Sequence, residues 1–296
     1  MAGTLKIIKK ELSDHFSSQR IAIIIFLVAV IGFTMAYSSV LGIVLEYKRT
    51  LGESLFLKLF TTQQGSIPSF QGFLAYFGPL IGFILVFDAI NREESNGTLG
   101  LLLSQPIHRD ALINGKFGAV ILTISFLLVS VFSLIISIGI ARLGALPTIE
   151  EILRITSFLF ISIIYLSTWA STGILFSILF QREGTSALAS IATWLFFSIF
   201  VYMIPGLNIS VGISSIGFWF SPSTIYTQAS SVMLYPTLRI LGPISYEEIV
   251  SMLPTPLPFT ESLLLIWPHM TYLLSTMLIL FIISYVKFMR REIRST

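Results

Sequence analysis

Charged side chains are scarce in this chain, and one polar stretch that contains several of them lies between residues 91 and 116. This stretch reads NREESNGTLGLLLSQPIHRDALINGK and holds acid–base pairs, a Gly-Thr step before a leucine-rich turn, and a proline followed by an arginine. Apolar runs of membrane length lie on both sides of it. A connection that only joined two spans would need none of these features. The stretch therefore favours a short amphipathic helix that is presented to another molecule in the cytoplasm.

A helix in this stretch would expose one apolar face and charged ends. Ser95 or Asn96 is expected to cap it, because their side chains accept hydrogen bonds from the first free backbone N–H groups. Pro106 is expected to end it. The residues on the apolar face or in the flanking charged and breaking positions are Arg92, Glu93, Glu94, Thr98, Leu99, Leu102, Leu103, Pro106 and Arg109. The alternative is a surface helix that lies against the membrane without a partner, and the periodicity alone does not separate the two.

The chain carries no phosphate-binding loop of the form G-x-x-x-x-G-K-[ST]. Its Gly-Lys pair, Gly115-Lys116, is followed by Phe117, and Asp110 stands where the first glycine is required. ATP hydrolysis would therefore require a separate nucleotide-binding subunit.

Other catalytic and metal chemistry has little support in the sequence. The chain contains no cysteine, which excludes disulfides and thiolate metal sites. The three histidines, His15, His108 and His269, are scattered, and no base–nucleophile pair lies within the apolar runs. No basic stripe with interleaved aromatic residues is present. We therefore expect no enzymatic activity, no cofactor or metal in this chain, and no nucleic-acid partner.

The composition indicates an all-α membrane protein. Of the 296 residues, 54% are hydrophobic and 11% are charged, with a mean hydropathy of +0.88; soluble domains carry about 25% charged residues. A helix needs about 20 apolar residues to cross a bilayer, and helices satisfy their own backbone groups there. The segments that meet this length are 21–44, 70–90, 117–141, 155–180, 186–205 and 263–286. They predict one transmembrane domain over 1–296, with a polar region at 91–116 and an outer loop at 206–262.

The distribution of basic residues predicts the orientation of these six spans. With the N-terminus inside, 12 of the 18 Lys and Arg residues fall on the cytoplasmic side. Positive charge is enriched in cytoplasmic loops, so both termini are expected in the cytoplasm.

Two regions outside the spans are expected to lie along the membrane surface. Residues 4–19 place Leu5, Ile8, Leu12 and Phe16 at helical spacing, which predicts an amphipathic helix on the inner leaflet. The alternative is a solvated positive flank that only sets the topology. The outer loop 206–262 is rich in prolines and apolar stretches, which favours short re-entrant or interfacial helices.

The middle of each span lacks ionisable residues, and Asp88 at the inner end of the second span is interpreted as an interfacial carboxylate that reaches toward water. Ion-coupled carriers usually need buried charges as relays, so a secondary carrier is disfavoured.

The run Glu93, Gly97-Thr98-Leu99, Leu101-Leu102-Leu103-Ser104, Pro106 and Arg109 resembles the signature of ABC-2 type permeases, the membrane subunits of one class of ATP-binding-cassette exporters. Lys10 to Asp14, Phe87 to Ile90 and the tail from Ser284 to Arg294 also resemble these permeases. Gly100 departs from the family motif, which commonly has an acidic residue there, and Ser95-Asn96 replace its usual charged pair. These departures weaken the inference of specific salt bridges to an ATPase.

The resemblance implies a type V exporter-like fold with an elbow helix at the N-terminus, six spans, a cytoplasmic coupling helix and re-entrant outer helices. It implies that the residues named above in the 91–116 region, together with Gly97, couple the permease to an ABC ATPase. Two copies of that ATPase would bind ATP and magnesium, and a second permease, the same or homologous, would complete the complex. The location implied is the plasma membrane of a prokaryote, in contact with membrane lipid.

Two further expectations accompany this resemblance. Gly78 and Gly82 in the second span could allow close helix contact, with packing inside the subunit as the favoured use. The alternative functions are a membrane subunit of an ATPase-driven complex that remodels or delivers to a partner protein, and a secondary carrier. The sequence does not identify the cargo.

Overall fold

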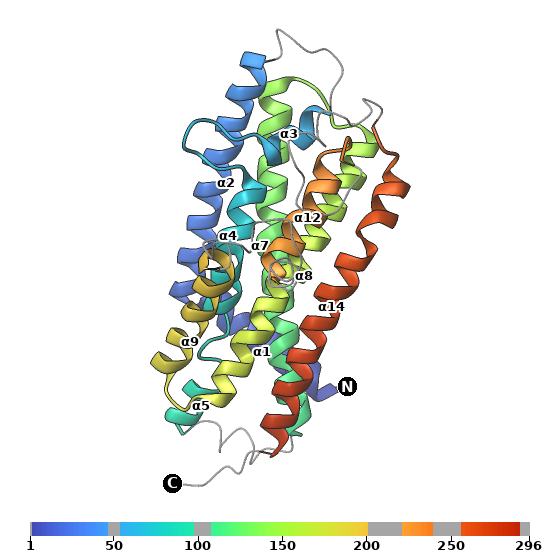
Figure 1. Ribbon diagram of the computed structural model, residues 1–296. Helices are drawn as coiled ribbons and strands as arrows, with labels where there is room; N and C mark the ends of the chain where they lie inside the picture. The colour runs from blue at the N-terminus through green and yellow to red at the C-terminus, as the bar shows by residue number, and fades with distance from the viewer. Residues whose placement is uncertain (1, 47–53, 98–107, 201–220, 239–255, 291–296) are drawn as a thin grey trace.

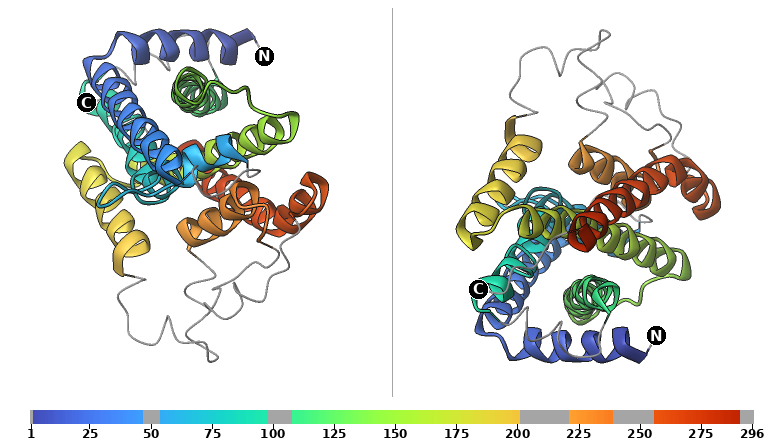
Figure 2. Two further views of the ribbon diagram at one scale, coloured as in Figure 1. Left: turned by 90° about the horizontal axis from the view of Figure 1, so that it is seen from above. Right: turned by 90° about the horizontal axis from the view of Figure 1, so that it is seen from below.

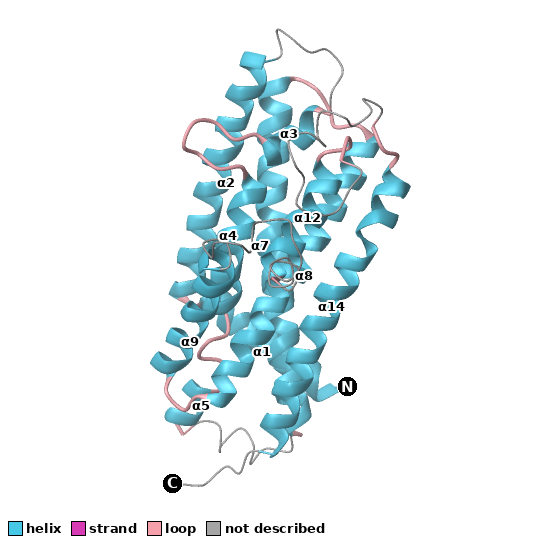
Figure 3. Ribbon diagram, viewed as in Figure 1, coloured by secondary structure: helices cyan, strands magenta, loops and turns pink. Residues whose placement is uncertain are grey.

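The computed structural model describes residues 2–46, 54–97, 108–200, 221–238 and 256–290. Within these ranges the chain is helical apart from connecting turns (Figure 3) and one isolated bridge between Gln64 and Ile67. The helices are α1 Ala2–Ser17, α2 Gln19–Glu46, α3 Leu55–Thr61, α4 Phe70–Ile84, α5 Asn91–Ser95, α7 Arg109–Leu143, α8 Ile149–Leu179, α9 Glu183–Leu195, the π-helix η1 Phe196–Phe200, α12 Pro222–Leu234 and α14 Phe259–Arg290.

The long helices form an elongated bundle, and α1 crosses the bundle direction at one end (Figures 1 and 2). The short helix α5 and the last turn of α14 lie at that same end, which we call the α5 end. The short helices α3 and α12 lie toward the opposite end.

Five described helices are long and apolar enough to cross a membrane, and they cover Gln19–Val44, Arg109–Leu143, Ile149–Leu179, Glu183–Phe200 and Phe259–Arg290. Large apolar side chains are exposed on their outer faces; for example, Phe26 is 71% exposed and Leu264 is 70% exposed. Exposed apolar faces of this extent are typical of surfaces that contact lipid. These helices agree with five of the six predicted spans, although the last predicted residues of the fifth, 201–205, lie outside the described range.

For the second predicted span, 70–90, the prediction of a helix is wrong over the last six residues. The helix α4 ends at Ile84 after 15 residues, and residues 85–90 form turns. The backbone N–H groups of Ile90 and Asn91 donate to the hydroxyl of Ser177 on α8 (2.8 and 3.3 Å), so they do not continue a helical ladder. At 1.5 Å per residue, α4 is only about 22 Å long, which is shorter than the hydrocarbon core.

The helix that contains the third predicted span, 117–141, extends beyond it at both ends. The helix α7 starts at Arg109 and runs for 35 residues to Leu143, without a proline, before Gly144 caps it in the left-handed conformation (φ 67°). The last eight residues of the predicted polar region 91–116 therefore belong to this helix. Its first turns are polar and still helical because they pack against α1.

Helix α8 lies at the centre of the bundle and organises the polar interior. In its most apolar 18-residue window 67% of the residues are buried, against 17% in α14. Tyr165 of α8 stacks on Tyr226 of α12 with ring centroids 4.1 Å apart, and its hydroxyl donates to the carbonyl of Ala75 in α4 (2.7 Å). The hydroxyl of Tyr226 also bonds Ser162 of α8 (3.0 Å). These bonds fix α12 as a buried helix within the region predicted as an outer loop.

A buried arginine closes the same region onto α8. Arg154 is 1% exposed and bonds Glu150 one turn earlier. Its guanidinium also donates to the carbonyl of Leu257 and to the hydroxyl of Ser262 (3.2 Å). A guanidinium offers five donors, so one side chain can hold several separate segments.

The glycine pair Gly78 and Gly82 lies where α4 crosses α8. A Cβ added at Gly78 would be 3.0 Å from Leu166 Cδ1, and one added at Gly82 would be 2.7 Å from the carbonyl oxygen of Leu166. Neither contact leaves room for a side chain without movement, and the second is to backbone. Small residues here allow the two helices to approach closely.

We predict that Gly82→Ala destabilises the folded chain by about 1–3 kcal/mol, because α4 must move away from the backbone of α8. Thermal unfolding of the full chain in detergent would measure this. The control is Gly184→Ala, where an added Cβ meets nothing within 4 Å. Equal unfolding temperatures for the two variants would contradict the close α4–α8 contact.

Candidate functional site

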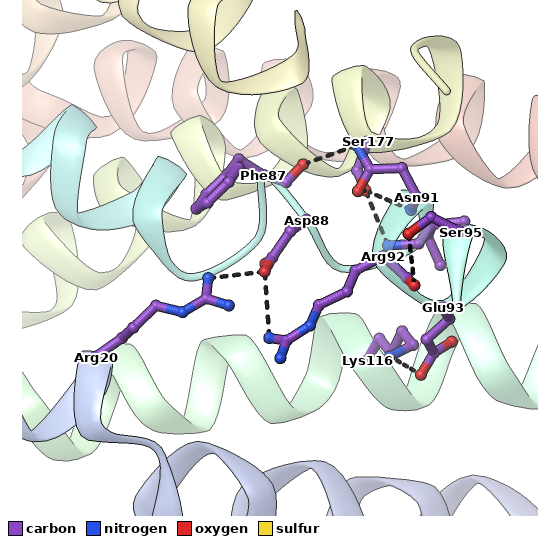
Figure 4. A network of polar contacts seen from close by, with 10 residues as sticks. Arg20, Phe87, Asp88, Asn91, Arg92, Glu93, Ser95, Lys116 and Ser177 are labelled. Carbon is purple, nitrogen blue, oxygen red and sulfur yellow. Dashed lines mark hydrogen bonds and ion pairs between the residues drawn. The ribbon is translucent and has the colours of Figure 1, made fainter. Parts of the chain in front are cut away.

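Six ionisable residues from four helices and a connecting turn gather at the α5 end of the bundle. They are Glu11 of α1, Arg20 of α2, Asp88 of the turn after α4, Arg92 and Glu93 of α5, and Lys116 of α7. We call them the charge cluster. Figure 4 shows most of this arrangement, with Arg20 and Arg92 both pointing to Asp88 and with Lys116 facing Glu93. The cluster joins the start of the predicted coupling region to three other helices.

Asp88 is a buried ion-paired residue. It is 9% exposed and accepts from Arg20 at 2.7 Å, while Arg92 lies 3.5 Å away. The interpretation of Asp88 as a carboxylate that reaches freely toward water is therefore wrong. Its partner Arg20 is 68 positions away in the sequence, so only the fold brings the two charges together.

Lys116 bridges two carboxylates from different helices. Its ammonium group donates to Glu93 of α5 (2.8 Å) and to Glu11 of α1 (3.0 Å), and the residue is only 6% exposed. A buried charge that loses its partners is strongly destabilising, because water no longer solvates it. The lysine therefore ties α5 and α1 to the first turns of α7.

Residues 95–97 lie at the end of the helix α5. The Ser95 hydroxyl donates to the carbonyl of Arg92 (3.1 Å), and Asn96 is the C-terminal cap of α5. The prediction that Ser95 or Asn96 caps the start of a following helix stays a prediction, because residues 98–107 lie outside the described part of the chain. Gly97 has φ 68°, a conformation that other residues rarely adopt. The chain thus turns sharply where the leucine-rich segment begins.

The predicted coupling residues fall in three places. Arg92 and Glu93 belong to the charge cluster, and Glu94 lies beside them in α5. Arg109 is the first residue of α7, with His108 as its N-cap, so it lies at the far end of the predicted region. Thr98, Leu99, Leu102, Leu103 and Pro106 lie outside the residues that the structure describes, and the coupling helix they were predicted to form stays a prediction.

Sequence reasoning did not find Glu11, Arg20 and Lys116 as members of this site. Arg20 and Lys116 each precede an apolar segment, where a charge usually only sets membrane topology, and Glu11 lies among other charges between Lys6 and Asp14. The available signal for the cluster was that three acidic and three basic residues were predicted on the same side of the membrane. Their pairing, however, depends on contacts between helices that are distant in sequence.

Helix α1 is also held to α7 by a histidine. The Thr123 hydroxyl donates to the carbonyl of Ala119 (2.9 Å), so its oxygen accepts from His15 Nδ1 (3.0 Å). Burial lowers the pKa of His15 below its ordinary value of 6.5; the nearby Glu11 opposes this shift and Lys116 adds to it. His15 is therefore neutral at physiological pH.

Comparison with known proteins identifies relatives of this chain. A family model described as ABC-2 family transporter protein matches residues 5–293. The probable ABC transporter permease protein NosY of Pseudomonas aeruginosa is 33% identical over 93 residues, which cover 31% of this chain and 32% of that protein. The protein of the same name from Stutzerimonas stutzeri is 29% identical over 147 residues, covering 49% of this chain and 46% of that protein. The matches thus span a third to a half of these relatives' length.

We predict that Lys116→Met lowers the free energy of unfolding by about 3–5 kcal/mol, because Glu11 and Glu93 would lose their buried partner. Lys116→Arg keeps the charge and should lose much less. Lys287→Met, which removes an exposed lysine near the end of α14, controls for loss of charge alone. If Lys116→Met and Lys287→Met unfold at the same temperature in detergent, Lys116 does not stabilise the site as described.

The contact between α1 and α7 should become less stable as the pH is lowered. Below about pH 6.5 the unfolded chain binds a proton at His15 more readily than the folded chain does, so protons favour unfolding. Thermal unfolding in detergent should therefore show a larger loss of stability between about pH 7.5 and pH 5.5 in the native chain than in His15→Gln. An identical pH dependence in both proteins would show that His15 is not the responsible group.

Proposed function

Because the chain belongs to the ABC-2 family of transporter proteins, we propose that it is the membrane-spanning permease subunit of an ATP-binding-cassette exporter. In this proposal a separate ATPase subunit binds ATP and magnesium and hydrolyses the nucleotide. The permease converts the resulting movement into translocation of a substrate. The observation that carries the proposal is the family match over residues 5–293.

The position of the charge cluster supports a coupling role for the segment that follows α5. A force applied to residues 91–97 acts directly on Lys116 of α7 through Glu93. It acts on α1 through the same lysine and Glu11, and on α2 through Asp88 and Arg20. Since separating buried opposite charges costs several kcal/mol, these helices are expected to move with the segment as a unit.

The same reasoning assigns the sides of the membrane in this proposal. The ATPase is a soluble protein that uses cytoplasmic ATP, so the α5 end would face the cytoplasm. The apolar faces of α2, α9 and α14 are exposed and available to lipid or to a second permease. We propose an assembly of two ATPase subunits and two permeases, identical or homologous, in a prokaryotic plasma membrane.

Co-purification with a candidate ABC ATPase tests the proposal. The ATPase should elute with the permease from detergent, and its rate of hydrolysis should rise in the complex. A complex that forms, hydrolyses ATP and yet leaves membrane transport of every candidate substrate unchanged would favour a subunit that acts on a partner protein instead. A chain that transports without any ATPase would contradict the proposal.

The left-handed glycine at the end of α5 gives a sharper test. We predict that Gly97→Ala weakens stimulation of the ATPase, because a Cβ in this conformation costs about 1–2 kcal/mol and redirects the chain as it enters the coupling segment. Gly144→Ala is the matched control: it has φ 67°, also meets no atom within 4 Å, and lies at the opposite end of the bundle. Equal stimulation in the two variants would contradict a coupling role for this turn.

The charge pair of α5 can be tested in the same assay. We predict that Glu93→Gln keeps the complex assembled but lowers the stimulated ATPase rate, because Lys116 then loses one of the two acidic partners that it has among the described residues. Glu150→Gln serves as the control, since Glu150 pairs with Arg154 at the other end of the same molecule. Full stimulation in Glu93→Gln would show that this bridge does not transmit the movement.

A further inference from the structure

A pocket of about 470 Å³ opens beside the charge cluster, between α1, α2, the end of α4, α5 and α7. This volume lies within the range of about 300–1,000 Å³ that small-molecule sites occupy. Its lining combines charged side chains with apolar ones, among them Ile21, Ile84, Leu85 and Val120. Ile84 is 41% exposed, so apolar surface is accessible next to the charges.

The charges that line this pocket differ in how far a ligand can reach them. Side-chain exposures of only 7–16% belong to the residues that are paired inside the cluster, which are Glu11, Asp88, Glu93 and Lys116. The side chains of Arg20 and Arg92 are 43% and 53% exposed. The exposed carboxylate of Asp14 has the ammonium of Lys10 at 3.8 Å. A ligand that enters the pocket therefore meets chiefly the two guanidinium groups.

The two arginines converge on one point from different helices. Within the described part of the chain, both pair with Asp88, and Nη1 of each approaches the same oxygen, Oδ2 (Figure 4). Arg20 also lies over the ring of Phe87, 5.8 Å from its centroid, which holds the side chain in place. A guanidinium has five N–H donors, so both groups keep donors for a further acceptor. One carboxylate between two guanidinium groups leaves this side of the pocket basic.

The start of α2 adds a second attraction for an anion. Ser17 and Ser18 directly precede this helix, and both line the pocket together with Arg20. The first turn of α2 contains no acidic residue. The first N–H groups of a helix have no partner within the helix and carry partial positive charge. Phosphate groups commonly bind at such helix starts.

We propose that this pocket binds a phosphate group that carries net negative charge, between Arg20, Arg92 and the start of α2. The guanidinium groups donate to the phosphate oxygens, which suit the planar arrangement of their N–H groups. The negative charge of the phosphate balances the positive charge that Asp88 leaves over. The headgroup of an anionic phospholipid and a soluble phosphate ester both offer this chemistry.

The surroundings favour the lipid as the source of the phosphate. The pocket lies where the membrane-length helix α2 begins, and α1 crosses the bundle direction there. Its apolar lining from Ile21, Ile84 and Val120 provides contact for the first part of acyl chains. Basic pockets between membrane helices hold anionic lipid headgroups in other proteins. The inference requires a multi-pass membrane protein and does not depend on the proposed transport function.

Lipid retention by the full chain tests the proposal. The chain is purified in detergent, exposed to equal amounts of phosphatidylglycerol and phosphatidylcholine with the same acyl chains, washed, and examined by native mass spectrometry. Phosphatidylglycerol should be retained about tenfold more, because the choline group neutralises its own phosphate and one charge-assisted hydrogen bond is worth about that factor. Equal retention of the two lipids overturns the proposal.

Variants of the two arginines separate this site from general attraction of charge. Arg92→Gln leaves the shorter pair of Arg20 with Asp88 in place and should lower the retention of phosphatidylglycerol about tenfold. Arg20→Lys keeps the charge but loses the fork of donors, and it should also lower retention.

The matched control is Arg290→Gln, which removes an exposed arginine from the last turn of α14 at the same end of the bundle and should change nothing. Equal losses in Arg290→Gln and Arg92→Gln would show binding by general charge alone, which overturns the site. Thermal unfolding of each variant confirms that the fold persists.

A soluble competitor distinguishes the two sources of the phosphate. Glycerol 3-phosphate is added to the chain loaded with phosphatidylglycerol, with sodium chloride of the same ionic strength as the control. If glycerol 3-phosphate displaces the lipid at equal concentration and sodium chloride does not, the pocket binds a phosphate group without help from acyl chains, and a soluble ester is the source. If neither displaces it, the apolar lining contributes and the lipid is the source. Displacement by sodium chloride to the same extent overturns a specific phosphate site.

Discussion

The main constraint on this structure is the free-energy cost of burying a charge without an oppositely charged partner. The spans contain very few ionisable residues, so the remaining charges at the α5 end have few possible partners. Lys116 is nearly fully buried and has two carboxylates within 3.0 Å, each from a different helix. Such a group fixes the relative positions of α1, α5 and α7, because any rearrangement that separates them exposes a buried charge to an apolar surrounding.

The opposite end of the bundle follows the same rule with different chemistry. Arg154 is buried and joins α8 to the last turn of α12, to Leu257 before α14 and to the start of α14. Tyr165 and Tyr226 satisfy their hydroxyl groups across α4, α8 and α12. Polar side chains of the central helix α8 thus provide the hydrogen-bond partners that water would provide if this region were an exposed loop. The apolar outer faces of the bundle remain free for contact with the membrane.

Much of the fold could be predicted from the sequence, because length and apolar composition decide which helices cross a bilayer. The helices α2, α8 and α14 begin and end within a few residues of the predicted spans, apart from the start of α8, which is six residues earlier. The turns that follow α4 could not be predicted, since Ile90 and Asn91 at their end donate to Ser177 of α8, which is 86 positions from Asn91 in the sequence. The partners of Asp88 and Lys116 could not be predicted either, because pairing between charges that are distant in sequence depends on the tertiary arrangement.

The uninterrupted course of α7 has a mechanical consequence. At 1.5 Å per residue its 35 residues form a stiff rod of about 50 Å. Lys116 lies about two turns from one end, and Gly139 near the other end leaves no space between the rod and Leu59 of α3. A tilt of only a few degrees at the charged end would displace the far end by several ångströms. The helix is therefore suited to act as a lever that carries a small displacement from one face of the membrane to the other.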